Sequence, residues 1–323
     1  MAVRVRVSIG GVARVVGVVG ATSAVLGCTS AIATPAEVDS YRRRAGTLVV
    51  RDTSPAAARG RYVSHRVRLS SSTGMTVDGR LFRPRAGSGC YPAVLLQNGR
   101  EENSNVIGRL PADFGDVVVL SLDYPAAVPG TLRLRDVLLR GDQLRRAMGE
   151  IPASFLLGVA YLAHRHDVDT GRIALAATSF AVPFATIAAA ADPRIREVAL
   201  IYGAGNLPAV VAANLTTGPR WLRRPLAWLA TRPFVTLAPE RYIGRIAPRR
   251  IVFVNGVDDP QMPVDAVRHL FDAAREPKSM TWLQTGHLMP TDSALIRTLV
   301  DSAFAQLAVL HAPAQPGRCA RRE

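Results

Sequence analysis

Short apolar runs alternate with longer stretches of helical periodicity over most of the chain, from about residue 61 to about residue 311. Two of the runs, Tyr91–Gln97 and Val117–Leu122, are continuous and uncharged, which is typical of a strand covered on both faces of its sheet. Two further runs, at 65–69 and 75–82, flank the turn Ser72-Thr73-Gly74 and predict an antiparallel pair. The remaining predicted strands are 172–176, 198–202, 250–255 and 279–284.

A long helical pattern runs from about Leu134 to His166, between two of these strands. We expect a break near Ile151-Pro152, because a proline can begin the second of two helices. Strands that alternate with helices in this way predict an α/β fold. We expect a mainly parallel, twisted sheet of about eight strands with helices on both faces.

The first 28 residues have the pattern of a secretory signal. Three arginines are followed by an uncharged apolar run, Val15–Leu26, which is too short to span a hydrocarbon core of ~30 Å at ~1.5 Å per residue. The run ends in Val25-Leu26-Gly27-Cys28, which resembles a bacterial lipobox, whose cysteine is acylated. The resemblance implies an exported protein anchored to the membrane by a lipid on Cys28. A plain cleaved signal and an uncleaved anchor are the alternatives.

The composition predicts how the rest of the chain is divided. Residues 29–60 are rich in Ala, Thr, Ser, Pro and Arg without a sustained period, which predicts a tether. The folded domain is expected over residues 61–311 and a C-terminal tail over 312–323. In an oxidising compartment Cys90 and Cys319 could form a disulfide that fastens this tail, although two free cysteines are equally compatible with the sequence. Neither cysteine has a His or Cys at metal-ligand spacing, so we expect no metal site.

Composition and charge exclude some classes of protein. Of the 323 residues 48% are hydrophobic, enough to bury a full core, so a disordered chain is excluded. The formal net charge of +15 would suit a nucleic-acid partner. However, Lys278 is the only lysine and the arginines are scattered along the chain, which indicates a compositional bias. We therefore expect no nucleic-acid binding.

Ser179 lies where the strand predicted at 172–176 runs directly into a helical pattern. A serine on such a tight turn is exposed above the sheet, with its Oγ at the N-terminus of the helix. The turn crowds the strand against the helix and needs small residues two positions away, here Ala177 and Ala181. This segment resembles the nucleophile elbow G-x-S-x-G of α/β-hydrolases, with alanines in place of both glycines. The segment is most similar to those of dienelactone-hydrolase-like and prolyl-oligopeptidase-like enzymes. The preceding residues HDVDTGR, at 166–172, also resemble the residues that precede the elbow in those enzymes.

The resemblance covers about residues 61–310 and implies where an acid and a base lie. In this superfamily the acid follows a late strand, three residues after a glycine and four before a proline. Gly256 and Pro263 both place it at Asp259, with Asp258 as the fallback. The alternative is that either aspartate only caps the helix that begins near residue 264. The histidine follows the last strand, and of the six histidines only His287 has that position.

The residue types define the expected chemistry. A serine hydroxyl is a weak nucleophile and needs a base, so His287 would take the proton of Ser179 while Asp259 orients the imidazole. The resemblance implies an oxyanion hole made by the backbone N–H groups of Phe180 and Arg100. The Arg100 side chain has an alternative role as a surface ion pair with an adjacent glutamate. No cofactor is needed.

We therefore expect a serine hydrolase that cleaves small-molecule or lipid carboxylic esters with small or medium acyl groups. A peptidase or thioesterase would use the same three residues. A non-catalytic surface protein on a hydrolase scaffold is a further alternative, and Ala177 and Ala181 favour it because the family has glycines there.

The segment 205–249 is longer than one crossover helix requires. Trp221, Leu222, Leu226 and Leu229 recur in it at helical spacing, with arginines between them. The resemblance implies a helical cap that shapes the acyl pocket. A helix packed on the core, or one lying at a lipid interface, would have the same pattern.

Overall fold

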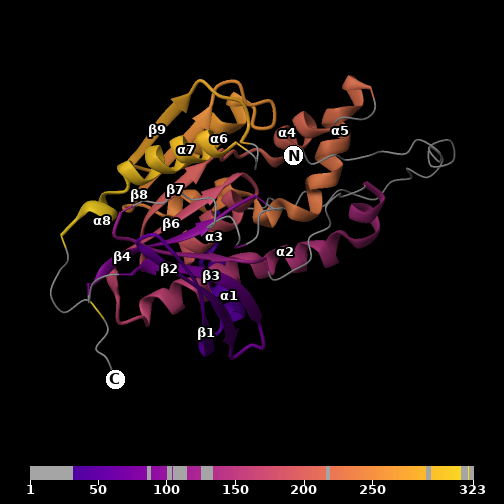
Figure 1. Cartoon of the computed structure of the whole chain (residues 1–323). Helices are drawn as coiled ribbons and strands as arrows, with labels where there is room; N and C mark the ends of the chain where they lie inside the picture. Colours follow the sequence, from indigo (N-terminus) through magenta and orange to yellow (C-terminus); the bar gives the residue numbers. More distant parts are fainter. Residues whose placement is uncertain are drawn as a thin grey trace.

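The computed structural model describes residues 32–85, 89–99, 104, 115–124, 134–215, 219–288, 292–313 and 319. In this part of the chain nine strands form a single sheet of order β1-β2-β3-β5-β4-β6-β7-β8-β9 (Figure 1). The predicted α/β fold is confirmed, with one strand more than expected. The strands are β1 Leu48–Arg59, β2 Tyr62–Ser71, β3 Thr76–Pro84, β4 Tyr91–Gln97, β5 Val118–Leu122, β6 Val168–Thr178, β7 Ile195–Ile201, β8 Arg250–Gly256 and β9 Lys278–Leu283.

The sheet has an antiparallel and a parallel part. Strands β1, β2, β3 and β5 pair antiparallel in that order, and β2 and β3 form the hairpin predicted around residues 72–74. From β5 through β4, β6, β7 and β8 to β9 every pair is parallel. The carboxyl ends of these parallel strands therefore lie along one edge of the sheet.

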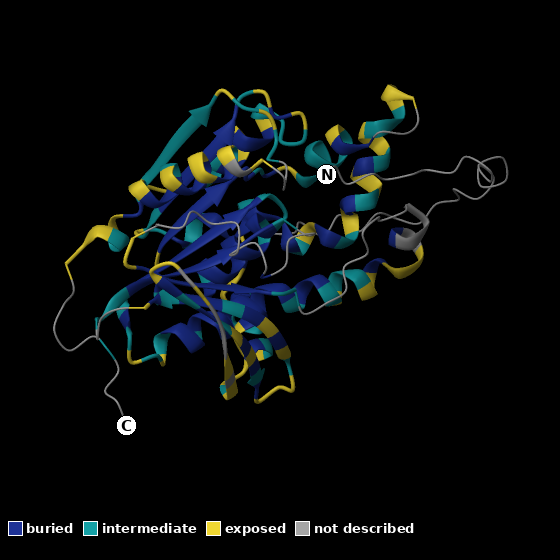
Figure 2. Ribbon diagram, viewed as in Figure 1, coloured by how far each residue is buried: buried dark blue, intermediate teal, exposed yellow. Residues whose placement is uncertain are grey.

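Helices cover both faces of the sheet, because alternate side chains of a strand point to opposite faces. In β4, Ala93 and Leu95 pack with the buried side chains of α1, α2, α3 and α6. Val94 and Leu96 pack with the buried side chains of α7 and with partly buried ones of α8 on the other face. Figure 2 accordingly shows the central strands almost wholly in the colour of buried residues. The helices are α1 Pro35–Ala45, α2 Leu134–Ala163, α3 Val182–Ala191, α4 Leu207–Asn214, α5 Arg220–Thr231, α6 Val264–Ala273, α7 Ser293–Gln306 and α8 Ala308–His311.

The prediction of a tether over residues 29–60 is wrong for residues 35–59, which form α1 and β1. Helix α1 begins at a capping box, in which Thr34 and Glu37 each bind the other's backbone N–H, with Pro35 in the first turn. Its Val38 and Tyr41 are buried in the main core. The folded part therefore begins well before residue 61.

Helix α2 deviates from a regular helix at a different place from the one predicted. Arg140 has non-helical dihedral angles (φ −132°), whereas Pro152 lies inside the continuous second part of the helix. Pro152 is buried, so the proline is accommodated within the helix on its core side.

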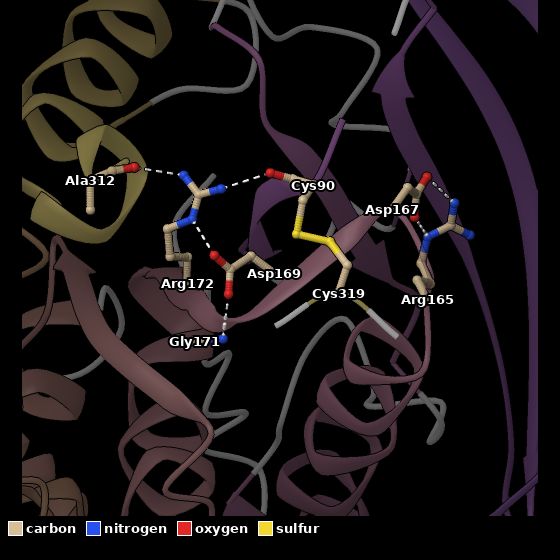
Figure 3. Close-up of a disulfide and its surroundings, with 8 residues drawn as sticks. All are labelled: Cys90, Arg165, Asp167, Asp169, Gly171, Arg172, Ala312 and Cys319. Carbon is tan, nitrogen blue, oxygen red and sulfur yellow. Dashed lines mark hydrogen bonds and ion pairs between the residues drawn. A yellow bond between two sulfur atoms is a disulfide. The ribbon is translucent and has the colours of Figure 1, made fainter. Parts of the chain in front are cut away.

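A disulfide joins Cys90, just before β4, to Cys319 (Figure 3). Beside it the buried guanidinium of Arg172 binds the Asp169 carboxylate and the backbone carbonyls of Cys90 and Ala312. The bond and these contacts fasten the C-terminal residues to the amino ends of β4 and β6, on the side of the sheet opposite to Ser179. No helix among the described residues is long and apolar enough to cross a membrane.

Candidate active site

Ser179 lies at the carboxyl end of β6, where the strand turns into a helix. It begins a single 3-10 turn, η3 Ser179–Ala181, which leads directly into α3. Its φ of 52° lies in the left-handed region, where a non-glycine residue is strained by about 1–3 kcal/mol. Ala177 and Ala181 are fully buried, as expected where strand and helix are crowded together. The local geometry is that of a nucleophile elbow with alanines in place of glycines.

His287 and Asp259 meet Ser179 at this edge of the sheet. The Ser179 Oγ lies 3.4 Å from His287 Nε2, and His287 Nδ1 lies 2.6 Å from Asp259 Oδ2. His287 comes from the loop after β9, and Asp259 from the loop after β8. The longer of the two contacts is of the kind that tightens when substrate binds. The structure thus brings together the three residues predicted from the sequence, in a continuous hydrogen-bonded chain.

The two neighbouring aspartates differ in their surroundings. The side chain of Asp259 is buried, and its Oδ1 accepts from the backbone N–H groups of Gln261 (2.7 Å) and Met262 (3.1 Å). The residue before α6 is Pro263, with no side-chain cap, so the alternative of a helix-capping aspartate is wrong. Asp258 is exposed. Of the two carboxylates, it is therefore Asp259 that binds His287.

Tyr202, at the end of β7, holds the histidine loop and was missed by the sequence reasoning. Its hydroxyl donates to the carbonyl of Gly286 (2.9 Å), and its ring lies 5.2 Å from the His287 ring, centroid to centroid. Burial raises the pKa of Tyr202, so the hydroxyl keeps the proton that it donates. Gly256 contributes by lacking a side chain, because a Cβ there would lie 2.3 Å from the carbonyl oxygen of Thr285. Nothing in the sequence distinguishes Tyr202 from an ordinary strand residue.

Of the two predicted oxyanion donors, the structure describes Phe180, in the 3-10 turn η3. Phe180 directly follows Ser179, and its ring packs against Phe184 (5.2 Å between centroids) and Tyr124 (5.5 Å). The Tyr124 hydroxyl donates to the carbonyl of Asn98, so it fixes the first residue of the loop after β4. Arg100, the second predicted donor, lies outside the described residues, as does the proposed lipidation site Cys28.

An apolar cavity of about 230 Å³ opens beside Ser179. Ser179, Phe180 and Phe184 form one wall, at the start of α3. Described residues of the segment 205–249, on α4, α5 and the 3-10 turn η4 Arg232–Leu237, also line the cavity. This segment therefore lies where a cap over the site was predicted.

The described residues contain no group of three or more His, Cys, Asp or Glu side chains arranged to hold a metal ion.

The fold is shared with solved structures of esterases. An acetyl xylan esterase from Paenibacillus sp. R4 superposes with a TM-score of 0.63 at 16% identity, covering 82% of this chain and 93% of that one. Acetyl xylan esterase 1 from Thermoanaerobacterium sp. JW/SL YS485 gives 0.58 at 14% identity, over 83% and 94%. A cold-adapted esterase from an Arctic intertidal metagenomic library gives 0.51 at 12% identity, over 80% and 100%. No protein-family model and no curated protein matches the sequence. The chain has the α/β-hydrolase fold.

Proposed function

We propose that the protein is a serine hydrolase that cleaves carboxylic esters through an acyl-serine intermediate. The observation that carries the proposal is the hydrogen-bonded chain from Ser179 through His287 to the buried Asp259. The structural neighbours named above are esterases, which supports ester substrates over amides or thioesters. The apolar cavity beside Ser179 gives the acyl group a place to bind.

In the proposed reaction His287 Nε2 removes the proton of Ser179 while Oγ attacks the ester carbonyl carbon. The Asp259 carboxylate stabilises the imidazolium that forms. The backbone N–H of Phe180, at the start of the helical turn, stabilises the negative oxygen of the tetrahedral intermediate. The intermediate collapses as the C–O bond breaks, and the departing alcohol takes the proton from His287. Water then attacks the acyl-serine in the same way and releases the carboxylic acid.

We also propose that the protein is exported and anchored by a lipid on Cys28. The support is the basic and apolar pattern of residues 1–28, which ends in the lipobox-like Val25-Leu26-Gly27-Cys28. The disulfide between Cys90 and Cys319 suits an oxidising compartment. An anchored enzyme of this kind would act on esters outside the cytoplasm.

A fluorophosphonate probe tests the proposed nucleophile directly. We expect the full chain to be labelled with one probe per molecule, to carry the adduct on the peptide that contains Ser179, and to hydrolyse p-nitrophenyl acetate or butyrate. Mass spectrometry locates the adduct. A folded protein that neither reacts nor hydrolyses any ester would establish the non-catalytic alternative. Cleavage of matched anilides as fast as esters would establish a peptidase.

A further inference from the structure

The cavity beside Ser179 is apolar in a way that selects one class of acyl group. Four of the described residues that line it have polar side chains and none is charged. Beyond Ser179, the Thr231 hydroxyl and the Asn214 NH2 group are bound within the protein, whereas Asn214 Oδ1 is a buried acceptor without a partner among the described residues. The Thr231 hydroxyl donates to the carbonyl of Ala227, and the Asn214 amide donates to the carbonyls of Val210 and Gln261. A sugar or a polar acyl group would lose its hydrogen bonds to water on entering and find few in return.

The volume of the cavity indicates how long an acyl chain it can accommodate. An acetyl group would leave most of the 230 Å³ empty. If each methylene takes about the ~30 Å³ that a water molecule occupies in the liquid, the cavity accommodates about six to eight carbon atoms. Buried Phe234 and Leu237 are among the residues that line the cavity, whose volume limits the length of the acyl chain that it accommodates.

We propose that this cavity binds a linear aliphatic acyl chain of medium length, near hexanoate to octanoate. The inference rests on the proposed function, because the acyl chain is that of the ester attacked by Ser179. It assigns α4 and α5, which supply Leu207, Val210 and Leu226 to the wall, the role of selecting the acyl group.

A series of p-nitrophenyl esters tests the chain length. Burying one methylene should raise kcat/KM about fourfold, so octanoate should exceed butyrate by about 10²-fold. The kcat/KM for the palmitate ester should be lower than that for the octanoate ester, because a sixteen-carbon chain is too long for the cavity. Ala230 lines the cavity, so a larger side chain there would fill part of it. Ala230→Phe should therefore lower the octanoate-to-acetate ratio of kcat/KM by at least tenfold. Ala213→Phe, on the exposed side of α4, is the matched control and should leave the ratio unchanged.

The outcomes separate the inference from the proposed function. Hydrolysis of acetate without any gain for longer chains overturns the inference and leaves the esterase standing. If no ester is hydrolysed, the proposed esterase function is wrong. Calorimetry with octanoate then tests separately whether the cavity binds an aliphatic chain. Binding with a negative heat-capacity change that Ala230→Phe weakens supports an aliphatic site, and no binding overturns it.

A second observation concerns the outer face of α5, which projects at the upper right of Figure 1. Leu226 and Ala230 face the cavity, whereas Trp221 and Trp228 are 75% and 53% exposed. Exposed Leu229 lies beside them. Large apolar side chains exposed together in this way mark an interaction surface.

The charges around these tryptophans indicate the partner. From residue 207 to residue 239 the sequence has four arginines and no acidic residue. Arg220 and Arg224 are exposed, and the Arg232 guanidinium stacks on Trp228 at 4.5 Å. Two copies of the chain joined through this face would bring their arginines together, which like-charge repulsion opposes. We infer that the outer face of α5 docks on an anionic lipid bilayer, where tryptophan and arginine side chains suit the interface.

Vesicle binding tests the docking face in the full chain carrying Cys28→Ser, which has no acyl group. Two of the three tryptophans of the chain are in α5, so binding to phosphatidylglycerol-containing vesicles should shift the tryptophan emission to shorter wavelength. The affinity should weaken with added salt and be far lower for phosphatidylcholine alone.

Matched charge variants locate the surface. Arg220→Gln with Arg224→Gln should weaken vesicle binding about thirtyfold, since each cation near an anionic surface contributes ~1 kcal/mol. Arg43→Gln with Arg297→Gln, exposed on α1 and α7, removes the same charge and should have little effect. Equal loss in both pairs, or binding independent of lipid charge, overturns the inference. Dimerisation that Trp221→Ser abolishes would assign the face to a second copy instead.

Discussion

Ser179→Ala should lower kcat/KM for p-nitrophenyl esters by about 10⁴–10⁶-fold and abolish fluorophosphonate labelling. The substitution removes the Oγ that lies 3.4 Å from His287 Nε2, and no other described group takes its place on the turn after β6. Stopped-flow and steady-state assays of wild type and variant measure the loss. A loss below tenfold would show that Ser179 is not the nucleophile.

The same residue offers a control for folding. Alanine keeps the strained left-handed conformation of φ 52°, whereas glycine adopts it without cost. Ser179→Gly should therefore be as inactive as Ser179→Ala but about 1 kcal/mol more stable, as measured by urea unfolding. A glycine variant no more stable than the alanine variant would mean that the turn relaxes in the mutants. An active glycine variant would contradict the assigned role of the serine.

The turn at Ser179 forms with alanines in place of both flanking glycines. Ala177, in β6, and Ala181, at the end of η3, are fully buried, so the packed turn accommodates the methyl group of each. The non-catalytic alternative was favoured by these alanines because the family has glycines at both positions. The alanines nevertheless leave Ser179 within reach of His287, the contact on which the proposed mechanism depends.

The core strands were predictable and the N-terminal elements were not, for a physical reason. Strands such as β4 are buried on both faces and therefore read as continuous apolar runs. Strand β1 is at the edge of the sheet, where it pairs with β2 alone, and Val49 and Val50 remain largely exposed. An edge strand of this composition has no alternation to detect. Helix α1 did have a signal, the Thr34-Pro35-Ala36-Glu37 capping box, which is typical of a helix N-terminus.

The site was predictable where the resemblance to α/β-hydrolases implies a spacing along the sequence. Counting from Gly256 and Pro263 selected Asp259, and the structure gives a reason for the glycine, since the histidine loop passes directly against it. Tyr202 could not be found in this way. Its contact with Gly286 joins the residue that follows β7 to the loop after β9, and only the folded sheet brings them together.

Asp259→Asn should lower kcat by about 10⁴-fold, while Asp258→Asn should stay within about twofold of wild type. Both substitutions remove one negative charge at adjacent positions, so any effect of net charge is shared. Asp259 differs in being buried and in accepting from His287 Nδ1, a bond that sets which imidazole nitrogen is free to take the serine proton. An asparagine there presents either an uncharged oxygen or an N–H to the ring, and in neither case does it stabilise the imidazolium.

The pair of aspartate variants also tests the histidine loop. The Asp258 backbone N–H donates to the carbonyl of Thr285, and Asp258→Asn preserves this contact. The activity of the Asp258→Asn variant therefore reports the effect of the side chain alone. Thermal unfolding of both variants identifies loss of fold as a separate cause. If Asp258→Asn proved the damaging substitution, the acid would be the exposed neighbour, and His287 would have to turn its Nδ1 towards solvent to reach it. Because Asp259 is also bound to the N–H groups of Gln261 and Met262, its carboxylate is held in place before substrate arrives, and the proposed reaction depends on that preorganisation.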